Sequence, residues 1–171
     1  LYMQVVAPPL ANVSTVEEVE KYSFPDPYAE GRLDDARKYI DKYKNDYFII
    51  GDLELTIFEM SWHMVGLEKF LMDMAMEEPY IEALLDKVKE FSIGIGKQLV
   101  EAGVDGIWAG DDFGSQNGMM ISPAMWRQIF KPRHAEVFRA LKAVNPDVLI
   151  MYHTDGAVAP ILEDLVEIGV D

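Results

Sequence analysis

The chain has 171 residues, of which 50% are apolar and 26% charged, with a net charge of −15, and this composition is typical of one globular domain. The acidic surface repels phosphate backbones and excludes nucleic acid as an expected partner, while the lack of cysteine excludes disulfides and thiolate metal ligands in this stretch. No apolar run approaches the roughly 20 residues of a transmembrane helix and no secretion leader is visible, so we expect a cytoplasmic protein with no membrane segment.

The first third of the chain predicts two helices and then a strand. Ser14 with Glu17 makes a capping-box pattern, which predicts a short helix to about residue 22. After the rigid Phe-Pro-Asp-Pro loop at 24–27, apolar residues at helical spacing predict a helix over 31–44. The apolar run 47–51, which ends in glycine, predicts a strand buried on both faces.

From residue 56 onward, helical periodicity alternates with short apolar runs that predict buried strands. The predicted strands cover 104–109 and 148–152. The predicted helices are two pieces over 56–76 broken near Gly66, and single helices over 79–102, 122–144 and 158–168. The helix over 122–144 starts at Ser122-Pro123 and bends at Pro132. Such alternation requires a parallel sheet with right-handed crossovers. The predicted fold class is therefore α/β, a partial (β/α)8 TIM barrel with parallel strands.

Two short segments of the chain have similar sequences, and this similarity bears on domain organisation. The segment 101–105 (Glu-Ala-Gly-Val-Asp) precedes a predicted strand, and 167–171 (Glu-Ile-Gly-Val-Asp) ends the sequence. By analogy a fourth strand would begin at the end of the chain. We therefore expect residues 1–171 to be a single barrel fragment that lacks N-terminal strands and the last strands; the alternative is a compact doubly wound domain.

Three strand exits carry polar side chains, and ligands bind parallel sheets at the carboxyl ends of strands. Asp52 and Glu54 follow the first strand, and in an extended segment they point the same way, ready to bind a metal, to hold a proton or to cap the next helix. The third exit holds His153 and Asp155, which suit an acid/base pair or two metal ligands.

The second exit is the loop 110–120, which has two adjacent acids, three glycines and two methionines. Asp111 and Asp112 are not expected to be core residues, so we expect a binding loop rather than a plain surface loop. Together the three exits predict an active site at one edge of the sheet, the rim. His63 and His134 are expected to be structural or surface residues on helices, and Arg127, Lys131 and Arg133 to lie on a helix out of reach.

Several of these segments resemble the uroporphyrinogen decarboxylase superfamily. The resemblance depends on residues 105–138, with Ile121-Ser122-Pro123, Trp126 and Lys131-Pro132-Arg133, and on the segments 24–27 and 152–156. It covers nearly the whole chain and corresponds to the middle and later part of a family member. One branch of that superfamily decarboxylates the acetate arms of uroporphyrinogen without a cofactor, and the other comprises zinc-dependent methyltransferases that move a methyl group from a corrinoid to a thiol.

The resemblance implies different roles for the third exit in the two branches. The methyltransferases have His-x-Cys-Gly there and bind zinc with the His and the Cys; His153 is retained, but Asp155 replaces the thiolate. The decarboxylases have Asp-Gly, which Asp155-Gly156 matches. They also place a tyrosine after the first exit, where this chain has Trp62 as the nearest aromatic residue, so that contact is altered.

The sequence as a whole predicts a uroporphyrinogen decarboxylase-like enzyme acting on a tetrapyrrole-type substrate without a cofactor. The alternatives are a zinc- and corrinoid-dependent methyltransferase whose partner is a corrinoid protein, a non-catalytic tetrapyrrole or corrinoid binding module, and a metal-dependent hydrolase. A homodimer is one possible assembly of this protein. The candidate site residues are Asp112, His153 and Asp155 as catalytic residues, His153 also as a metal ligand, and Glu54, Trp62, Asp111, Phe113, Gln116 and Met119 as substrate-binding residues.

Overall fold

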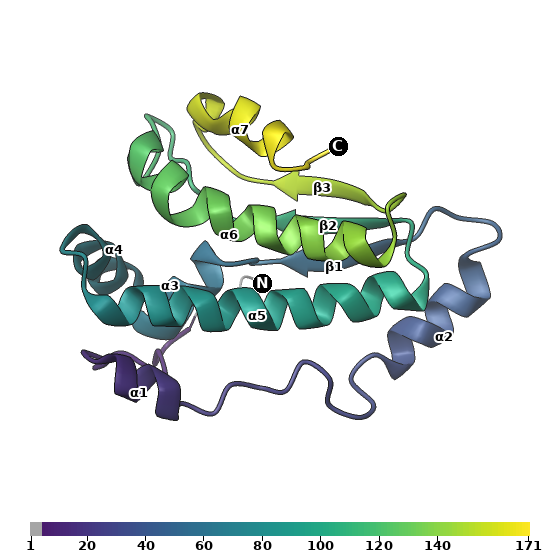
Figure 1. Cartoon of the computed structure of the whole chain (residues 1–171), viewed down its shortest axis with the longest axis horizontal. Helices are drawn as coiled ribbons and strands as arrows, with labels where there is room; N and C mark the ends of the chain where they lie inside the picture. The colour runs from purple at the N-terminus through teal and green to yellow at the C-terminus, as the bar shows by residue number, and fades with distance from the viewer. Residues whose placement is uncertain (1–4) are drawn as a thin grey trace.

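The described part of the protein is built on a parallel sheet of three strands. A computed structural model describes residues 5–171 and leaves residues 1–4 of the predicted domain outside the described part. The strands β1 (Ile50–Glu54), β2 (Gly106–Gly110) and β3 (Leu149–His153) pair in the order β1-β2-β3, both pairs parallel. The predicted parallel sheet is therefore confirmed, and the carboxyl ends of its strands share one edge, at the left in Figure 1.

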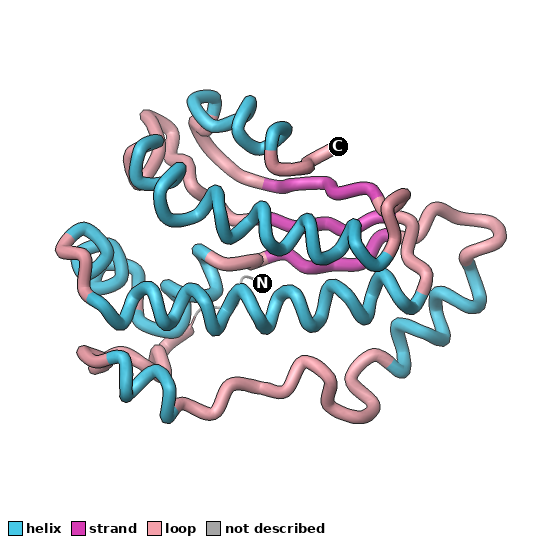
Figure 2. Tube along the Cα trace, in the orientation of Figure 1, coloured by secondary structure: helices cyan, strands magenta, loops and turns pink. Residues whose placement is uncertain are grey.

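Helices supply the crossovers between these strands. Helices α5 (Pro79–Ala102) and α6 (Pro123–Val144) run side by side along one face of the sheet (Figure 1). Figure 2 shows the long loop between the first two helices running beside α5, where the Gln98 side chain donates to the Pro27 carbonyl at 2.6 Å. The remaining helices are α1 (Val16–Lys21), α2 (Asp34–Tyr43), α3 (Phe58–Val65), α4 (Leu67–Ala75), the 3-10 turn η1 (Ala159–Ile161) and α7 (Leu162–Glu167).

The predicted helices are present, with α3 and α4 separated at Gly66 as expected. The capping box of the first helix is formed by Thr15 and Glu18 and not by Ser14 and Glu17, and the last helix begins with the 3-10 turn η1.

The first strand was predicted too early. It begins at Ile50 because the chain keeps turning after α2, with the Tyr47 amide donating to the Tyr43 carbonyl at 3.0 Å. The expectation of burial on both faces was also wrong, because β1 alternates exposed and buried positions. Asp52 and Glu54 therefore lie within the strand, both exposed on the same face, as the extended spacing predicted.

The two faces of the sheet have different environments. The face toward α5 and α6 carries fully buried side chains such as Ile107 and Ile150. On the other face Ile50 is 48% exposed and Leu149 is 42% exposed. Within residues 5–171, no helix combines the length and the apolar character that a bilayer crossing requires.

Thr56 connects the end of β1 to its neighbours from a fully buried position. Its hydroxyl donates to the Leu53 carbonyl and accepts from the Gly110 amide, both at 3.0 Å. Its amide donates to the Gly110 carbonyl at 2.9 Å, and its carbonyl accepts from the Ser92 hydroxyl at 2.6 Å. One residue therefore holds the ends of β1 and β2 and the middle of α5 together.

We expect Thr56→Val to lower the free energy of unfolding by about 1–3 kcal/mol, because it leaves the buried Gly110 amide without an acceptor while keeping the side-chain volume. Urea denaturation measures this change. Thr56→Ser is the matched control, since it keeps the hydroxyl and should retain more stability than the valine variant. Equal losses in the two variants would contradict the assignment.

Candidate functional site

The register of the sheet brings the first and third strand exits to the same row. Glu54 pairs with Gly110, and Gly110 pairs with His153. Because Gly110 has no side chain, Glu54 and His153 face each other across it, and Glu54 Oε1 lies 3.9 Å from His153 Nε2. A Cβ at position 110 would lie 2.8 Å from the His153 carbonyl oxygen, so the row requires glycine there.

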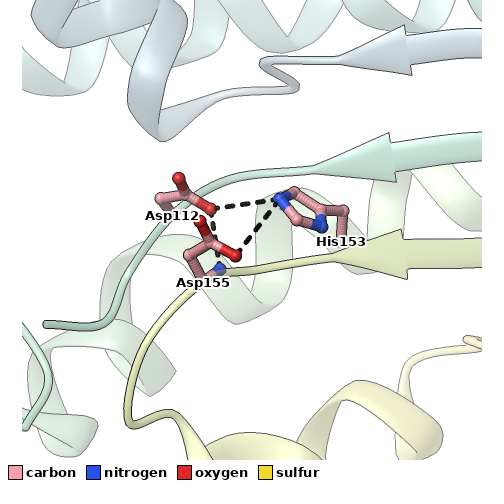
Figure 3. Close-up of side chains that lie close together, drawn as sticks. All are labelled: Asp112, His153 and Asp155. Atoms are coloured by element: carbon pink, nitrogen blue, oxygen red, sulfur yellow. Dashed lines mark hydrogen bonds and ion pairs between the residues drawn. The ribbon is translucent and has the colours of Figure 1, made fainter. Parts of the chain in front are cut away.

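The second exit completes a cluster around the same imidazole. His153 Nε2 lies 3.6 Å from Asp112 Oδ1 and 3.7 Å from Asp155 Oδ1 (Figure 3). The Asp155 amide also donates to Asp112 Oδ1 at 2.7 Å. Trp108 stacks near the imidazole with ring centroids 5.8 Å apart. The three predicted catalytic residues are therefore close together in space.

Two glycines allow the loops that carry Asp112 and Asp155 to touch. A Cβ on Gly114 would lie 2.4 Å from the Asp155 carbonyl oxygen, and a Cβ on Gly156 would lie 2.4 Å from the Gly114 carbonyl carbon. The Ala157 amide donates to the Ser115 carbonyl at 2.9 Å across the same contact. This backbone packing holds the β2–α6 loop against the β3 exit.

A pocket of about 630 Å³ opens beside the cluster. Its acidic lining residues are Glu54, Glu59 and Asp112, and its aromatic lining residues are Trp62 and His63. Predicted residues Glu54 and Trp62 therefore line a cavity together with the predicted catalytic Asp112. The remaining described residues that line it are Val5, Pro8, Leu55, Gly66 and Leu67.

Glu59 is a half-buried carboxyl of this pocket that the sequence analysis did not single out. Its Oε2 accepts the Asp112 amide at 3.0 Å. Desolvation, followed by repulsion from Asp112, Asp111 and Glu54, raises the pKa of Glu59 to about 7. A signal was available in the sequence, because Glu59 is the one acid in the apolar stretch 55–67 directly after a strand exit.

The expectation that both acids of the second exit lie outside the core was wrong for Asp111. Its side chain is fully buried and accepts the amides of Ile57 at 3.0 Å and Glu59 at 2.9 Å at the start of α3. His134 Nε2 lies 3.0 Å from Asp111 Oδ2. Successive residues leave β2 in opposite directions, so Asp111 enters the core while Asp112 faces the pocket. His134 is structural, as expected.

Three other predicted substrate-binding residues lie away from the pocket. Phe113 is fully buried and packs on Phe58, with ring centroids 4.7 Å apart, so it has no surface for a substrate. Gln116 is exposed in the β2–α6 loop. Met119 lines a separate hollow of about 460 Å³ with Pro160. Within this loop Gly114 and Met119 form a local antiparallel bridge.

Arg127, Lys131 and Arg133 lie on α6, as the sequence analysis expected, and all three pair with acidic side chains. Arg127 and Lys131 contact Asp164 at 2.9 and 2.7 Å. Arg133 contacts Asp86 at 2.9 Å and also pairs with Glu82. Among the described residues that line the 630 Å³ pocket, none is a lysine or an arginine.

The donor chemistry of the cluster fits a divalent cation. One ligand atom each from Asp112, His153 and Asp155 lies within 4.8 Å of the other two. Zinc–nitrogen and zinc–oxygen bonds of about 2.0–2.2 Å place two tetrahedral ligands roughly 3.3–3.6 Å apart. The distances of 3.6 and 3.7 Å from His153 Nε2 are close to that span, and Glu54 is the next carboxylate. Imidazole with carboxylates suits zinc and other first-row divalent ions.

Comparison with known proteins defines the class of this fold and then the family. A solved methyltransferase from Methanosarcina mazei is similar, with a TM-score of 0.65 and 28% identity over 78% of this chain and 37% of that chain. The α/β fold is thus that of part of a (β/α)8 barrel. The family model "Uroporphyrinogen decarboxylase (URO-D)" matches residues 3–171, so the chain belongs to the uroporphyrinogen decarboxylase family. The comparison with curated proteins gave no match.

We expect Gly114→Ala to separate the two loops of the cluster, because its methyl group would meet the Asp155 backbone at 2.4 Å. Overpacking of this kind costs about 1–3 kcal/mol of unfolding free energy, and the Asp155 amide resonance should shift as its hydrogen bond to Asp112 breaks. Gly118→Ala is the matched control from the same loop, since a Cβ there meets nothing within 4 Å. An unchanged Asp155 amide in Gly114→Ala would refute the proposed packing.

The raised pKa of Glu59 predicts a titration near neutral pH in the metal-free protein. A carbon-13 NMR titration of the Glu59 carboxyl should have its midpoint near pH 7, and Asp112→Asn should lower it by removing a repelling charge. Because the folded pKa exceeds the unfolded one, ionisation of Glu59 destabilises the fold as the pH rises from about 4.5 to 7. Glu59→Gln should abolish that loss of stability, and a midpoint near 4.5 in the native protein would contradict the prediction.

Proposed function

We propose that the chain forms part of a metal-dependent methyltransferase site in which Asp112, His153 and Asp155 bind a divalent cation, zinc in the first instance. The observation that carries the proposal is the convergence of these three side chains from neighbouring strand exits at distances suited to one ion. The 28% identity with a methyltransferase supports the same reaction class.

The cation would act as a Lewis acid that lowers the pKa of a bound acceptor such as a thiol. Asp112 and Asp155 would neutralise the charge of the cation and, with His153, would hold it at the rim. Glu59, which lines the same pocket beside Asp112, accepts the proton that the acceptor releases. Trp62 and Leu67 form an apolar side of the pocket, which suits the methyl donor. A methylated corrinoid, free or carried by a partner protein, is the donor class that we propose.

Electrostatics favour this proposal over uroporphyrinogen decarboxylation. Uroporphyrinogen carries several carboxylates, and a site for it needs cations close to them. The described lining of the pocket carries three carboxylates and no lysine or arginine. Bringing a polyanion there would place like charges together, whereas a bound divalent cation would relieve the repulsion among the same carboxylates.

Decarboxylation remains the second candidate, and one observation favours it. Glu59 is a half-buried carboxyl in the pocket wall, and decarboxylation of a pyrrole acetate requires a proton donor near the ring. Formation of coproporphyrinogen from uroporphyrinogen by the metal-free chain, measured by chromatography of the oxidised porphyrins, would support this candidate.

We expect the purified chain to bind one zinc ion in isothermal titration calorimetry, and His153→Ala and Asp155→Asn each to weaken binding by about tenfold or more, because each removes one of few ligands. Glu163→Gln is the control, since Glu163 is an exposed carboxylate on α7 away from the cluster, and it should bind zinc like the native chain. Equal zinc binding in His153→Ala would refute the metal site.

Methyl transfer is tested with methylcobalamin and a simple thiol such as 2-mercaptoethanol. We expect zinc-dependent loss of methylcobalamin absorbance and formation of the methyl thioether, both abolished in His153→Ala and retained in Glu163→Gln. If the protein binds zinc but forms no thioether, the result would count against methyl transfer. The chain would then be better described as a metal-binding module.

A further inference from the structure

His134 occupies a junction of three segments that lead to the rim. Its fully buried ring comes from α6, and Nδ1 contacts the Phe130 carbonyl at 3.0 Å. Its Nε2 lies 3.0 Å from Asp111 Oδ2 and 3.1 Å from the Tyr152 hydroxyl. Asp111 directly precedes Asp112, and Tyr152 directly precedes His153. One imidazole therefore contacts the residues that precede two members of the cluster.

The Asp111 carboxylate extends this junction to the pocket wall. It accepts the amides of Ile57 and Glu59 at the start of α3, the helix that carries Glu59 and Trp62. A carboxylate with 0% exposure needs a compensating partner. In the described part of the chain, His134 is the basic side chain within ion-pair distance of it.

The contacts of the His134 ring define where one of its hydrogens lies. A carbonyl oxygen only accepts, so Nδ1 donates to the Phe130 carbonyl. Nε2 lies between the Asp111 carboxyl and the Tyr152 hydroxyl and is within hydrogen-bond distance of both. Aromatic rings hold the imidazole in place, with centroids 6.0–6.5 Å from it for Phe138, Phe113, Trp126 and Phe130.

We propose that His134 is a positioning residue, which through Asp111 and Tyr152 holds the start of α3 and the exits of β2 and β3 in the arrangement that forms the rim site. Its effect on zinc affinity rests on the proposed function. Its effect on the start of α3 does not, because the hydrogen bonds of Asp111 exist without any ligand.

The test compares His134→Leu, which removes both ring nitrogens, with His134→Gln, which keeps a polar amide group in the place of Nε2. Leu141→Ala is the matched control, because Leu141 is a fully buried residue of α6 two turns further on that packs at Gly96. Hydrogen exchange of the Ile57 and Glu59 amides, measured by NMR, is the readout, with core amides of α5 as the reference for global stability.

We expect His134→Leu to lower the protection of the Ile57 and Glu59 amides by about tenfold or more beyond the change in the α5 amides. His134→Gln should restore most of that protection, and Leu141→Ala should lower all amides alike. A uniform loss in His134→Leu, or no rescue by glutamine, would overturn the positioning role and leave His134 as ordinary core packing.

Two further measurements keep the inference open to refutation if His134→Leu does not fold. The nitrogen-15 NMR spectrum of the native imidazole should show hydrogen on Nδ1, and a bare Nδ1 would overturn the ring orientation on which the positioning role depends. Zinc affinity of His134→Gln should stay within about threefold of the native value, and a larger loss would overturn the rescue by an amide on which the positioning role depends. Failure of the native chain to bind zinc would refute the proposed function. It would not affect the hydrogen-exchange test of the positioning role.

Discussion

Asp111 accepts two amides at the start of α3 and contacts His134 of α6 while its own side chain is fully excluded from solvent. The rest of the rim depends on this buried carboxylate. It provides the acceptor that the start of α3 needs, since Ile57 has no side-chain acceptor to cap the helix itself. A helix without its own cap is thereby oriented by a residue 54 positions away in the chain.

The parallel register turns separate polar residues into one cluster. Side chains at the ends of neighbouring parallel strands face the same edge, and here one row of the sheet contains Glu54, Gly110 and His153. The middle position has no side chain, so the outer two approach each other. Asp112 and Asp155, which lie two residues after Gly110 and His153, then meet because glycines let their loops touch backbone to backbone.

The charges of the site favour one of the two reactions, decarboxylation or methyl transfer, over the other. The uroporphyrinogen decarboxylase family and a methyltransferase neighbour define the fold, and the chain spans 37% of the length of that neighbour. The described pocket has carboxylates, an imidazole and an apolar wall but no lysine or arginine. Such a pocket attracts cations and repels polyanions, and for this reason we place metal-dependent methyl transfer before decarboxylation.

The sequence by itself determined the type and order of the helices and strands, because the apolar spacing that marks them is local, but it placed the first strand three residues too early. It also determined that Asp112, His153 and Asp155 meet, since the alternation of elements implies parallel strands with a common rim. Tertiary structure alone decided that Asp111 enters the core and that His134 contacts it. Burial and hydrogen bonding of a charged group depend on partners distant in the chain, and no local pattern distinguishes Asp111 from Asp112.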